Sequence, residues 1–495
     1  MRFVFRVDAS IDIGTGHVMR CLALAEALRA RGGEPFFICK TGVGNLIHVI
    51  EDRGIAVKAI PSDLPSVTAD ALATIRHTDA ADWTIVDHYS LGKEWESAIR
   101  STGTRVLAIE DLDDRKHAAD VVLDSTYPGD RRRYESRTTA ELLLGPRYAL
   151  LASAYSHQRN SRPVRSPAAP SVLVFFGGTD QRNATGITLR ALGRPEFRGL
   201  PVVVVLGESN PHQAEISRLV SKNPSWRAAH VQPNLADFMA ASDLLISGGG
   251  VTILERLCMG LPGVAVTLAK NQEPSTLALA HAGLTGYAGD IADLSEASLA
   301  KDIAALIADV PRRTHMAEAG RLVVDGLGAL RVAEILMPTN PKSMLIRPAD
   351  LHDVGTYFSW ANDDAVRVQA IHSEPIEWDA HQAWFTKRLN SDSSFMFILE
   401  AHGLPMAQAR FDVDGSHLVL DYSVDARFRG RGLGSLVVQL ALELLPKATP
   451  SAVRALVKES NFASLSALEA VRFVRTETRD PETNLVELRL QRATH

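Results

Sequence analysis

The chain has 495 residues, 46% of them hydrophobic, and a formal net charge of −5; this length exceeds one compact core and predicts two or three domains. Lys and Arg are spread along the sequence, which argues against nucleic acid as a partner. No apolar stretch approaches the roughly 20 residues that span a bilayer. The first apolar run carries charges and lacks a cleavage-site pattern, so we expect a cytoplasmic protein without a membrane partner.

Short apolar runs alternate with helical patterns from residue 1 to about 337. A helix is predicted over Val18–Arg29, where apolar residues recur every three or four positions before Gly32-Gly33. This alternation is typical of βα units around a parallel sheet. The strand candidates of this first part are Val4–Val7, Phe36–Ile38, Val57–Ile60, Thr84–Val86 and Val106–Ile109.

A Pro- and Ser-rich stretch from Ser161 to Pro170 predicts a linker, after which the alternation restarts. The new strand candidates are Val172–Phe176, Val202–Leu206, Leu244–Ile246 and Val264–Val266. Two α/β segments of similar size predict two Rossmann-like domains that face a cleft, over residues 1–160 and 170–337. A second Pro-rich stretch, Met337–Lys342, marks the end of this part.

The last part, residues 344–491, has a different pattern. A strand and helices precede a meander of strands without intervening helices, and a Gly-rich turn then leads into a helix over Ser435–Leu445. The meander candidates are Phe395–Glu400, Met406–Phe411 and Leu418–Val424. The pattern predicts an α+β domain.

A glycine-containing loop, Asp8 to His17, follows the first strand and opens the first predicted helix. Gly14 and Gly16 allow a ligand to approach the backbone closely, and free N–H groups at the helix start attract anions. His17 stands at the carboxyl end of the first strand, where open α/β sheets bind their ligands. A single His after such a loop is otherwise most often structural.

A second glycine loop precedes the predicted helix Val251–Met259. Gly248, Gly249 and Gly250 at a helix start form a good diphosphate cradle. Glu255, one turn further on, could accept two hydrogen bonds from a ribose diol. The alternative interpretation is a solvated Glu after a tight turn.

These loops and four further segments together resemble the UDP-sugar hydrolase family of the pseudaminic acid pathway, which is related to the GT-B glycosyltransferases of peptidoglycan synthesis. The segments are Asp8–Cys21, Asp87–Tyr89, Gly145–Tyr148, Phe176–Asp180 and Ser247–Pro262 followed by Asn271-Gln272. The resemblance covers nearly all of residues 1–337. It implies release of UDP from UDP-2,4-diacetamido-2,4,6-trideoxy-β-L-altropyranose.

The resemblance implies roles for individual residues. His17 is the expected catalytic base, because a neutral imidazole can accept a proton from water at physiological pH. UDP is expected at Gly248, Gly249, Gly250, Thr252 and Glu255; Thr252 is included because this chain has Val251 where the family usually has a small hydroxyl residue. The sugar is expected at Gly14, Gly16, Asp87, His88, Tyr89, Gly177, Gly178, Asn271 and Gln272. No residues have metal-ligand spacing, so a metal-independent reaction is predicted.

The Gly-rich turn of the last part runs from Arg429 to Gly434. It is similar to the Arg-x-x-Gly-x-Gly pyrophosphate loop of GNAT acetyltransferases. The resemblance extends over residues 344 to about 490 and favours the aminosugar branch, in which His381 and Trp384 bind substrate. It implies acetyl-CoA as co-substrate, and the residues expected to bind it are Val424, Arg429, Gly430, Arg431, Gly432, Gly434, Asn461 and Ser464. The backbone N–H near Val424 is expected to polarise the thioester.

Two positions depart from the GNAT pattern. Leu468 stands where the superfamily often has a Tyr that protonates the leaving thiolate, and Arg472 stands where Gly is usual. Tyr422 is the candidate substitute for that Tyr, and Asp421 is the candidate base for the sugar amine. Either CoA leaves with a proton from water or another residue, or the domain is impaired.

The two resemblances support each other. The acetyltransferase would install the 4-acetamido group of a UDP-aminosugar, and the hydrolase would then remove UDP from that product. The predicted fold is therefore two Rossmann-like domains of GT-B type followed by a GNAT domain. The alternative is a GT-B glycosyltransferase whose GNAT domain only binds CoA and regulates.

Overall fold

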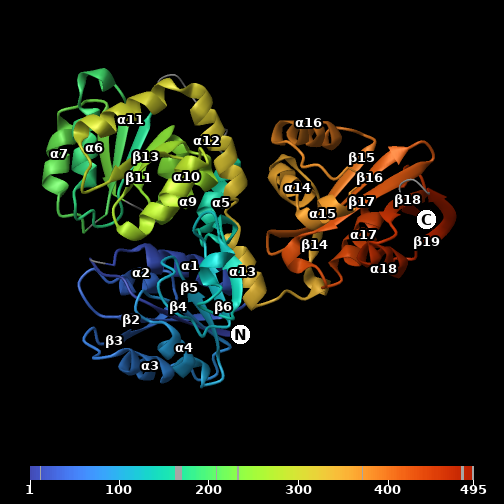
Figure 1. The fold of residues 1–495 in the computed structure, drawn as a ribbon, viewed down its shortest axis with the longest axis horizontal. Helices are drawn as coiled ribbons and strands as arrows, with labels where there is room; N and C mark the ends of the chain where they lie inside the picture. Colours follow the sequence, from blue (N-terminus) through green and yellow to red (C-terminus); the bar gives the residue numbers. More distant parts are fainter. Residues whose placement is uncertain are drawn as a thin grey trace. The chain divides into compact units, whose positions relative to one another are not determined.

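The computed structural model describes residues 1–11, 13–161, 170–207, 209–230, 234–370, 372–480 and 484–492. The chain divides into two compact units, Met1–Met337 and Pro338–His495 (Figure 1). Of the expected linker between the two Rossmann-like domains, residues 162–169 lie outside the described residues.

The first half of unit 1 is built on a seven-stranded parallel sheet of order β3-β2-β1-β4-β5-β6-β7. Its strands are β1 (Arg2–Val7), β2 (Glu34–Lys40), β3 (Ala56–Ile60), β4 (Trp83–Asp87), β5 (Arg105–Ile109), β6 (Val121–Asp124) and β7 (Glu141–Leu144). Its helices are α1 (Gly16–Arg29), α2 (Ile47–Asp52), α3 (Val67–Ile75) and α4 (Lys93–Arg100). The strand order reverses between β1 and β4, so the carboxyl ends of these two strands are where a ligand site is expected.

The second half repeats this plan with a six-stranded parallel sheet of order β10-β9-β8-β11-β12-β13. Its strands are β8 (Val172–Phe175), β9 (Val202–Leu206), β10 (Trp226–His230), β11 (Leu244–Gly248), β12 (Gly263–Thr267) and β13 (Gly286–Asp290). Its helices are α6 (Ala184–Leu192), α7 (Gln213–Ser221), α8 (Ala236–Ala241), α9 (Val251–Met259), α10 (Glu273–His281), α11 (Glu296–Ala308) and α12 (Val310–Val323). The order reverses between β8 and β11, and the prediction of two Rossmann-like halves is confirmed.

Two helices each pack on the half to which they do not belong in sequence (Figure 1). Tyr155 of α5 (Ser153–Ser161) lies in the core of the second half with residues of α9. On α13 (Gly328–Leu336), Glu334 pairs with Arg31 at 2.6 Å across the first half. The expected ranges 1–160 and 170–337 follow chain order, whereas the packing joins the last helix of each range to the other half.

Unit 2 is a mixed sheet of order β14-β15-β16-β17-β18-β20-β19. Its strands are β14 (Leu345–Pro348), β15 (Ser394–Ala401), β16 (Leu404–Asp414), β17 (His417–Val424), β18 (Ala452–Lys458), β19 (Val474–Asp480) and β20 (Leu485–Gln491). Its helices are α14 (Val354–Ala361), α15 (Asp364–Gln369), α16 (Trp378–Leu389), α17 (Leu433–Leu444) and α18 (Phe462–Ala470). Neighbouring strands are antiparallel except β17 and β18, which are parallel, and the predicted α+β class is confirmed.

Arg472 ends α18 in a left-handed conformation, with φ of 70°. Its N–H donates to the carbonyl of Glu469 and the N–H of Phe473 donates to that of Leu468, which is the Schellman arrangement that favours Gly at this position. Leu468 and Phe473 are both buried and fix this end of the helix. The Gly-to-Arg departure in the sequence therefore stands at a position where a side chain is strained.

We expect Arg472→Gly to raise the free energy of unfolding of unit 2 by about 1 kcal/mol, because Gly adopts this backbone conformation without the Cβ penalty. The measurement is calorimetric unfolding of the whole chain, following the transition that acetyl-CoA shifts upward. Arg472→Ala removes the same charge and keeps the Cβ. An equal gain from Arg472→Ala would assign the effect to charge instead.

Candidate active sites

The expected hydrolase residues gather at the points where the strand order of both sheets in unit 1 reverses. His17 follows β1 at the start of α1, and Asp87–Tyr89 ends and follows the neighbouring strand β4. In the second half, Gly177-Gly178 follows β8 and Gly248–Gly250 ends and follows the neighbouring β11. These are the positions at which open α/β sheets bind ligands.

His17 and Asp87 form a close pair beneath a pocket. His17 Nδ1 lies 2.5 Å from Asp87 Oδ1, and the two side chains are 7% and 1% exposed. Arg20, one turn further along α1, donates from Nε to Asp87 Oδ2 and from Nη2 to Oδ1, both at 2.6 Å. Sequence reasoning missed Arg20; its spacing of three residues from His17 places both on one face of α1, which was the available signal.

The pairing indicates which imidazole nitrogen of His17 carries the proton. Burial by itself raises the pKa of Asp87, but the charge of Arg20 and the hydrogen bonds from Arg20 and His17 hold it well below its usual range. Arg20 Nη2 also lies 3.1 Å from His17 Nδ1, but the Asp87 oxygen is much closer, at 2.5 Å. An ionised carboxylate only accepts hydrogen bonds, so His17 Nδ1 carries the proton. In the neutral ring Nε2 then has the free lone pair.

A second histidine in the same pocket is arranged differently. The pocket is lined by Asp8, Ile13, His17, Asp87, His88 and Tyr89. His88 Nδ1 accepts from the N–H of Ser90 at 3.1 Å, and its Nε2 lies 3.3 Å from Asp8 Oδ2. Both nitrogens of His88 are therefore engaged, which leaves His17 as the histidine able to accept a proton there.

Tyr89 joins the two halves of unit 1. Its ring meets the His17 ring edge-on with centroids 4.7 Å apart, and Asn271 Nδ2 donates to its hydroxyl at 3.3 Å. Burial, followed by the charge of Asp111, raises the pKa of Tyr89 to about 12, so the phenol stays protonated. Tyr89 thus contacts both His17 and Asn271, which are 254 positions apart in the sequence.

The glycine loops of the two halves approach one another closely. A Cβ on Gly178 would lie 3.2 Å from Thr15 Cγ2, and one on Gly16 would lie 3.8 Å from Val251 Cγ2. The start of α1 is therefore close to the start of α9. Two helix N-termini with free N–H groups favour a negatively charged ligand between them.

The Gly248–Gly250 loop is tightly held. A Cβ on Gly249 would come within 2.5 Å of Thr276 Oγ1, so glycine is required at this close approach. Gln272 Oε1 accepts from the N–H of Leu268 at 2.9 Å, which places its amide beside Gly250. Thr252 is half-buried in the first turn of α9.

Glu255 lies one turn into α9, half-buried and hydrogen-bonded by the Tyr155 hydroxyl. Burial raises its pKa to about 7, although the bond from Tyr155 lowers it. A carboxyl group that titrates near neutrality is typical of a ligand site.

If Glu255 accepts ribose hydroxyls, UDP affinity should rise as pH increases from 6 to 8, because the raised pKa leaves the carboxyl protonated below about 7. Calorimetric titration with UDP measures this affinity. The phosphate of UDP titrates in every variant, so Glu255→Gln isolates the carboxyl contribution. Identical pH dependence in the two proteins would contradict the assignment.

In unit 2, the strands β17 and β18 separate where the acetyl-CoA site is expected. They pair only over His417–Val419, while β17 continues to Val424. The backbone beyond Val419 therefore lacks a β18 partner. Such an opening can receive a thioester between the strands and offer it backbone N–H donors.

The expected pyrophosphate loop follows directly. Gly430 and Gly432 have φ of 78° and 75°, conformations that favour glycine, and Gly432 is the N-cap of α17. Arg429 Nε donates to the carbonyl of Val424, and its Nη2 lies 2.6 Å from Asp363 Oδ1. The guanidinium of Arg431 lies over the ring of Phe428. This glycine loop at a helix start fits a diphosphate.

Tyr422 lies beside this loop. A Cβ on Gly434 would come within 3.1 Å of Tyr422 Cε2, and the Tyr422 hydroxyl donates to the carbonyl of Ser464 at 3.4 Å. Asn461 caps α18 by accepting from the N–H of Ser464. Burial raises the pKa of Tyr422. A protonated phenol is therefore available next to α18, whose Leu468 is buried.

The expected acceptor residues lie in a series, with Arg410 between Asp421 and Trp384 and with the His381 ring 5.4 Å from the Trp384 ring. Asp421 is more than half exposed and accepts from Gln408 Nε2 at 3.1 Å. Trp384 has the guanidinium of Arg410 over its ring at 4.9 Å. His381 is 2% exposed among aromatic rings and donates to the carbonyl of Val354, and burial lowers its pKa to about 4. This placement favours packing for His381.

Two general features of the described residues bear on the site. No helix among them is long and apolar enough to cross a membrane. In the same residues, no group of three or more His, Cys, Asp or Glu side chains is arranged to hold a metal ion.

The comparisons with known proteins match both units. Residues 172–325 match the glycosyltransferase family 28 C-terminal domain, and residues 343–474 match the acetyltransferase (GNAT) domain. The spore coat polysaccharide biosynthesis protein SpsG of Bacillus subtilis is 23% identical over 332 residues, 66% of this chain and 96% of that protein. The UDP-2,4-diacetamido-2,4,6-trideoxy-β-L-altropyranose hydrolase of Campylobacter jejuni is 24% identical over 287 residues, 57% of this chain and 97% of that protein.

An uncharacterized protein of Methanocaldococcus jannaschii aligns along both units, with 21% identity over 491 residues, 96% of this chain and 97% of its own. The chain is thus a fusion of a GT-B-like unit and an acetyltransferase domain. Unit 1 carries a glycosyltransferase family 28-like domain and is homologous to the Campylobacter UDP-sugar hydrolase, and unit 2 is a GNAT domain. These homologies support an enzyme with hydrolase and N-acetyltransferase activity.

Proposed function

We propose that unit 1 hydrolyses UDP-2,4-diacetamido-2,4,6-trideoxy-β-L-altropyranose to the free sugar and UDP, and that unit 2 makes this substrate. In that step acetyl-CoA acetylates the 4-amine of the preceding UDP-aminosugar, in nonulosonic (pseudaminic) acid synthesis. The hydrolase assignment is supported most by the His17–Asp87 pair, which engages Nδ1 of His17 and lines the pocket at the strand-order reversal. The printed name of the Campylobacter relative supports the choice of sugar.

In the hydrolase step, His17 Nε2 accepts a proton from water as the water oxygen bonds to the anomeric carbon. The bond from that carbon to the UDP oxygen breaks at the same time. Asp87 stabilises the imidazolium that forms on His17. The free N–H groups after Gly250 stabilise the charge that collects on the leaving diphosphate.

In the acetyltransferase step, the sugar amine attacks the thioester carbonyl carbon and the carbon–sulfur bond breaks. Asp421 accepts a proton from the amine, and the CoA thiolate takes a proton from Tyr422 or water. The separated strands β17 and β18 and the glycine loop of α17 support this placement of acetyl-CoA.

The test incubates the purified chain with UDP-4-amino-4,6-dideoxy-N-acetyl-β-L-altrosamine and acetyl-CoA and follows CoASH and UDP together. We expect both products. We also expect His17→Ala to lower UDP release at least about 100-fold while CoASH release persists. CoASH release reports on unit 2, so unchanged UDP affinity of His17→Ala controls for the folding of unit 1.

A glycosyltransferase is the second candidate, favoured by the family 28 match. It predicts CoASH release without UDP until a sugar acceptor is added. Release of neither product would contradict the proposed sugar or acyl donor.

A further inference from the structure

A charged cluster of Glu96, Glu110, Arg115 and His117 is linked to the hydrolase pocket through the carbonyl of His88. All but the partly exposed Arg115 are buried, and the proposed reaction uses none of the four. His117 Nδ1 lies 2.7 Å from Glu96 Oε1, and its Nε2 lies 3.0 Å from Glu110 Oε2. Both carboxylates accept, so both imidazole nitrogens carry protons and His117 is a cation. With Arg115, two positive charges balance two negative charges in the interior.

This charged cluster fixes the loop of residues 110–117 that follows β5. Glu110 Oε1 accepts from the N–H groups of Asp111 and Leu112, both at 2.9 Å. On the other side of the ring, Glu96 of α4 accepts from the N–H of Ala118. Both ends of the loop are thereby tied to one imidazolium, whose loss would release them together.

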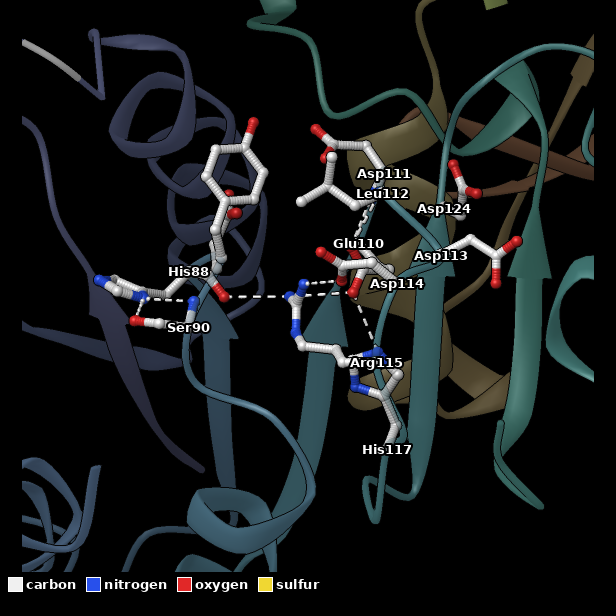
Figure 2. A network of polar contacts seen from close by, with 12 residues as sticks. His88, Ser90, Glu110, Asp111, Leu112, Asp113, Asp114, Arg115, His117 and Asp124 are labelled. Atoms are coloured by element: carbon white, nitrogen blue, oxygen red, sulfur yellow. Dashed lines mark hydrogen bonds and ion pairs between the residues drawn. The ribbon is translucent and has the colours of Figure 1, made fainter. Parts of the chain in front are cut away.

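Arg115 ties the same loop to the turn that carries His88 and Tyr89. Its Nη2 donates to the carbonyl of His88 at 3.0 Å and lies 2.9 Å from Glu110 Oε2. Figure 2 shows the guanidinium of Arg115 between His88 and Glu110. The segment after β4 and the segment after β5 are thus held at a fixed separation.

At its start the loop reaches the catalytic pair. Asp111 Oδ2 lies 3.3 Å from Arg20 Nη1, while the other two nitrogens of Arg20 hold Asp87. All three guanidinium nitrogens are therefore anchored, two by Asp87 and one by Asp111. The orientation of Arg20 therefore depends on Asp111 as well as on Asp87, which also orients His17.

We propose that the 110–117 loop is a positioning element of the hydrolase site, in which Asp111 fixes Arg20 against Asp87 and His17, and the Glu96–His117–Glu110–Arg115 cluster keeps Asp111 in place. The proposal rests on the proposed hydrolase function. Asp111 and the four residues of the cluster do not line the pocket, so we assign them as positioning residues. A misplacement of a catalytic pair by about 1 Å is enough to slow a reaction substantially.

The cluster also predicts an alkaline limit. The groups that face His117 are Glu96 from α4 and Glu110 and Arg115 from its own loop. The short helix Arg131–Tyr134 adds Tyr134, which interacts electrostatically with Glu110. Although burial lowers it, the two carboxylates raise the pKa of His117 to about 9. Because this pKa is raised on folding, the stabilisation that the charged His117 gives to the loop is complete below the ordinary pKa of His. It is lost as pH rises through about 9.

The test uses the whole chain and two variants, Asp111→Asn and His117→Gln, with Asp113→Asn as a control for Asp111. Asp113 lies in the same loop and pairs with Arg133 and Arg137 instead of Arg20. We expect Asp111→Asn to lower kcat for UDP release about 10-fold with KM and UDP affinity nearly unchanged. His117→Gln should lower kcat similarly and remove the fall in activity near pH 9.

Histidine-selective nitrogen NMR gives a readout that does not need turnover. In the unaltered chain His117 should stay an imidazolium up to about pH 9, and His17 should show a protonated Nδ1. Asp111→Asn should leave the His117 signals in place and average the His17 tautomers. If the chain releases no UDP but Asp111→Asn changes the His17 signals and leaves the His117 signals in place, the proposed function fails and the positioning proposal stands.

A His17 signal unaffected by Asp111→Asn, or kcat within twofold of the unaltered chain, would overturn the proposal. UDP affinity controls for the folding of unit 1, and if His117→Gln lowers that affinity, Asp111→Asn alone decides.

Discussion

Replacing Asp87 by Asn should lower kcat for UDP release about 1000-fold with little change in UDP affinity. The carboxylate holds the proton on His17 Nδ1 and accepts two bonds from Arg20. Asn that keeps its oxygen toward Arg20 turns its NH₂ toward His17, which forces the proton onto Nε2 and removes the base. Stopped assays of UDP release and calorimetric titration with UDP measure the two quantities.

The matched control for Asp87→Asn is Asp120→Asn. Asp120 also accepts from an arginine, Arg100, but is half-buried before β6 and does not line the pocket. It should leave UDP release within about twofold. If Asp87→Asn and Asp120→Asn reduce the rate equally, the orientation of His17 is not what limits the reaction.

Replacing Gly432 by Val should weaken acetyl-CoA binding about 100-fold. A Cβ on Gly432 meets no protein atom within 4 Å, so the side chain would enter the space left for the diphosphate. Two lost hydrogen bonds to a charged group, at about 1.5 kcal/mol each, correspond to this factor. Isothermal titration with acetyl-CoA measures it.

Gly403→Val is the control for backbone strain. Gly403 has φ of 77° in the turn between β15 and β16 and is equally free of neighbours within 4 Å. Both substitutions therefore carry a similar penalty of about 1–2 kcal/mol in folding. Equal loss of acetyl-CoA affinity in the two variants would show that strain, and not the ligand cradle, is responsible.

The strongly patterned elements could be predicted from the sequence alone. The helix over Val251–Met259 has the predicted bounds, and the predicted Val202–Leu206 is β9. Among the strands that were not predicted, β10 and β13 have few consecutive apolar residues, over Trp226–His230 and Gly286–Asp290. Each has a neighbour in the sheet that supplies the pairing which its own sequence does not indicate.

The candidate sites divide in the same way. Glycine loops after strands indicate the edge at which a ligand binds, since local backbone freedom and helix starts are properties of the sequence. Arg20 and Asp111 were not singled out. An arginine in a helix is most often solvated, and only the neighbouring strands β4 and β5 give it two carboxylate partners.

The sequence by itself determined the order of the units, their fold classes and the loops at which ligands are expected, because periodicity and turn chemistry act over a few residues. Tertiary structure decided which distant side chains meet. His17 contacts Asp87 because β1 pairs with β4, 80 residues further along, and α13 returns to the first half because its apolar face completes that core. These pairings depend on strand order and on the burial of whole faces, which no local pattern encodes.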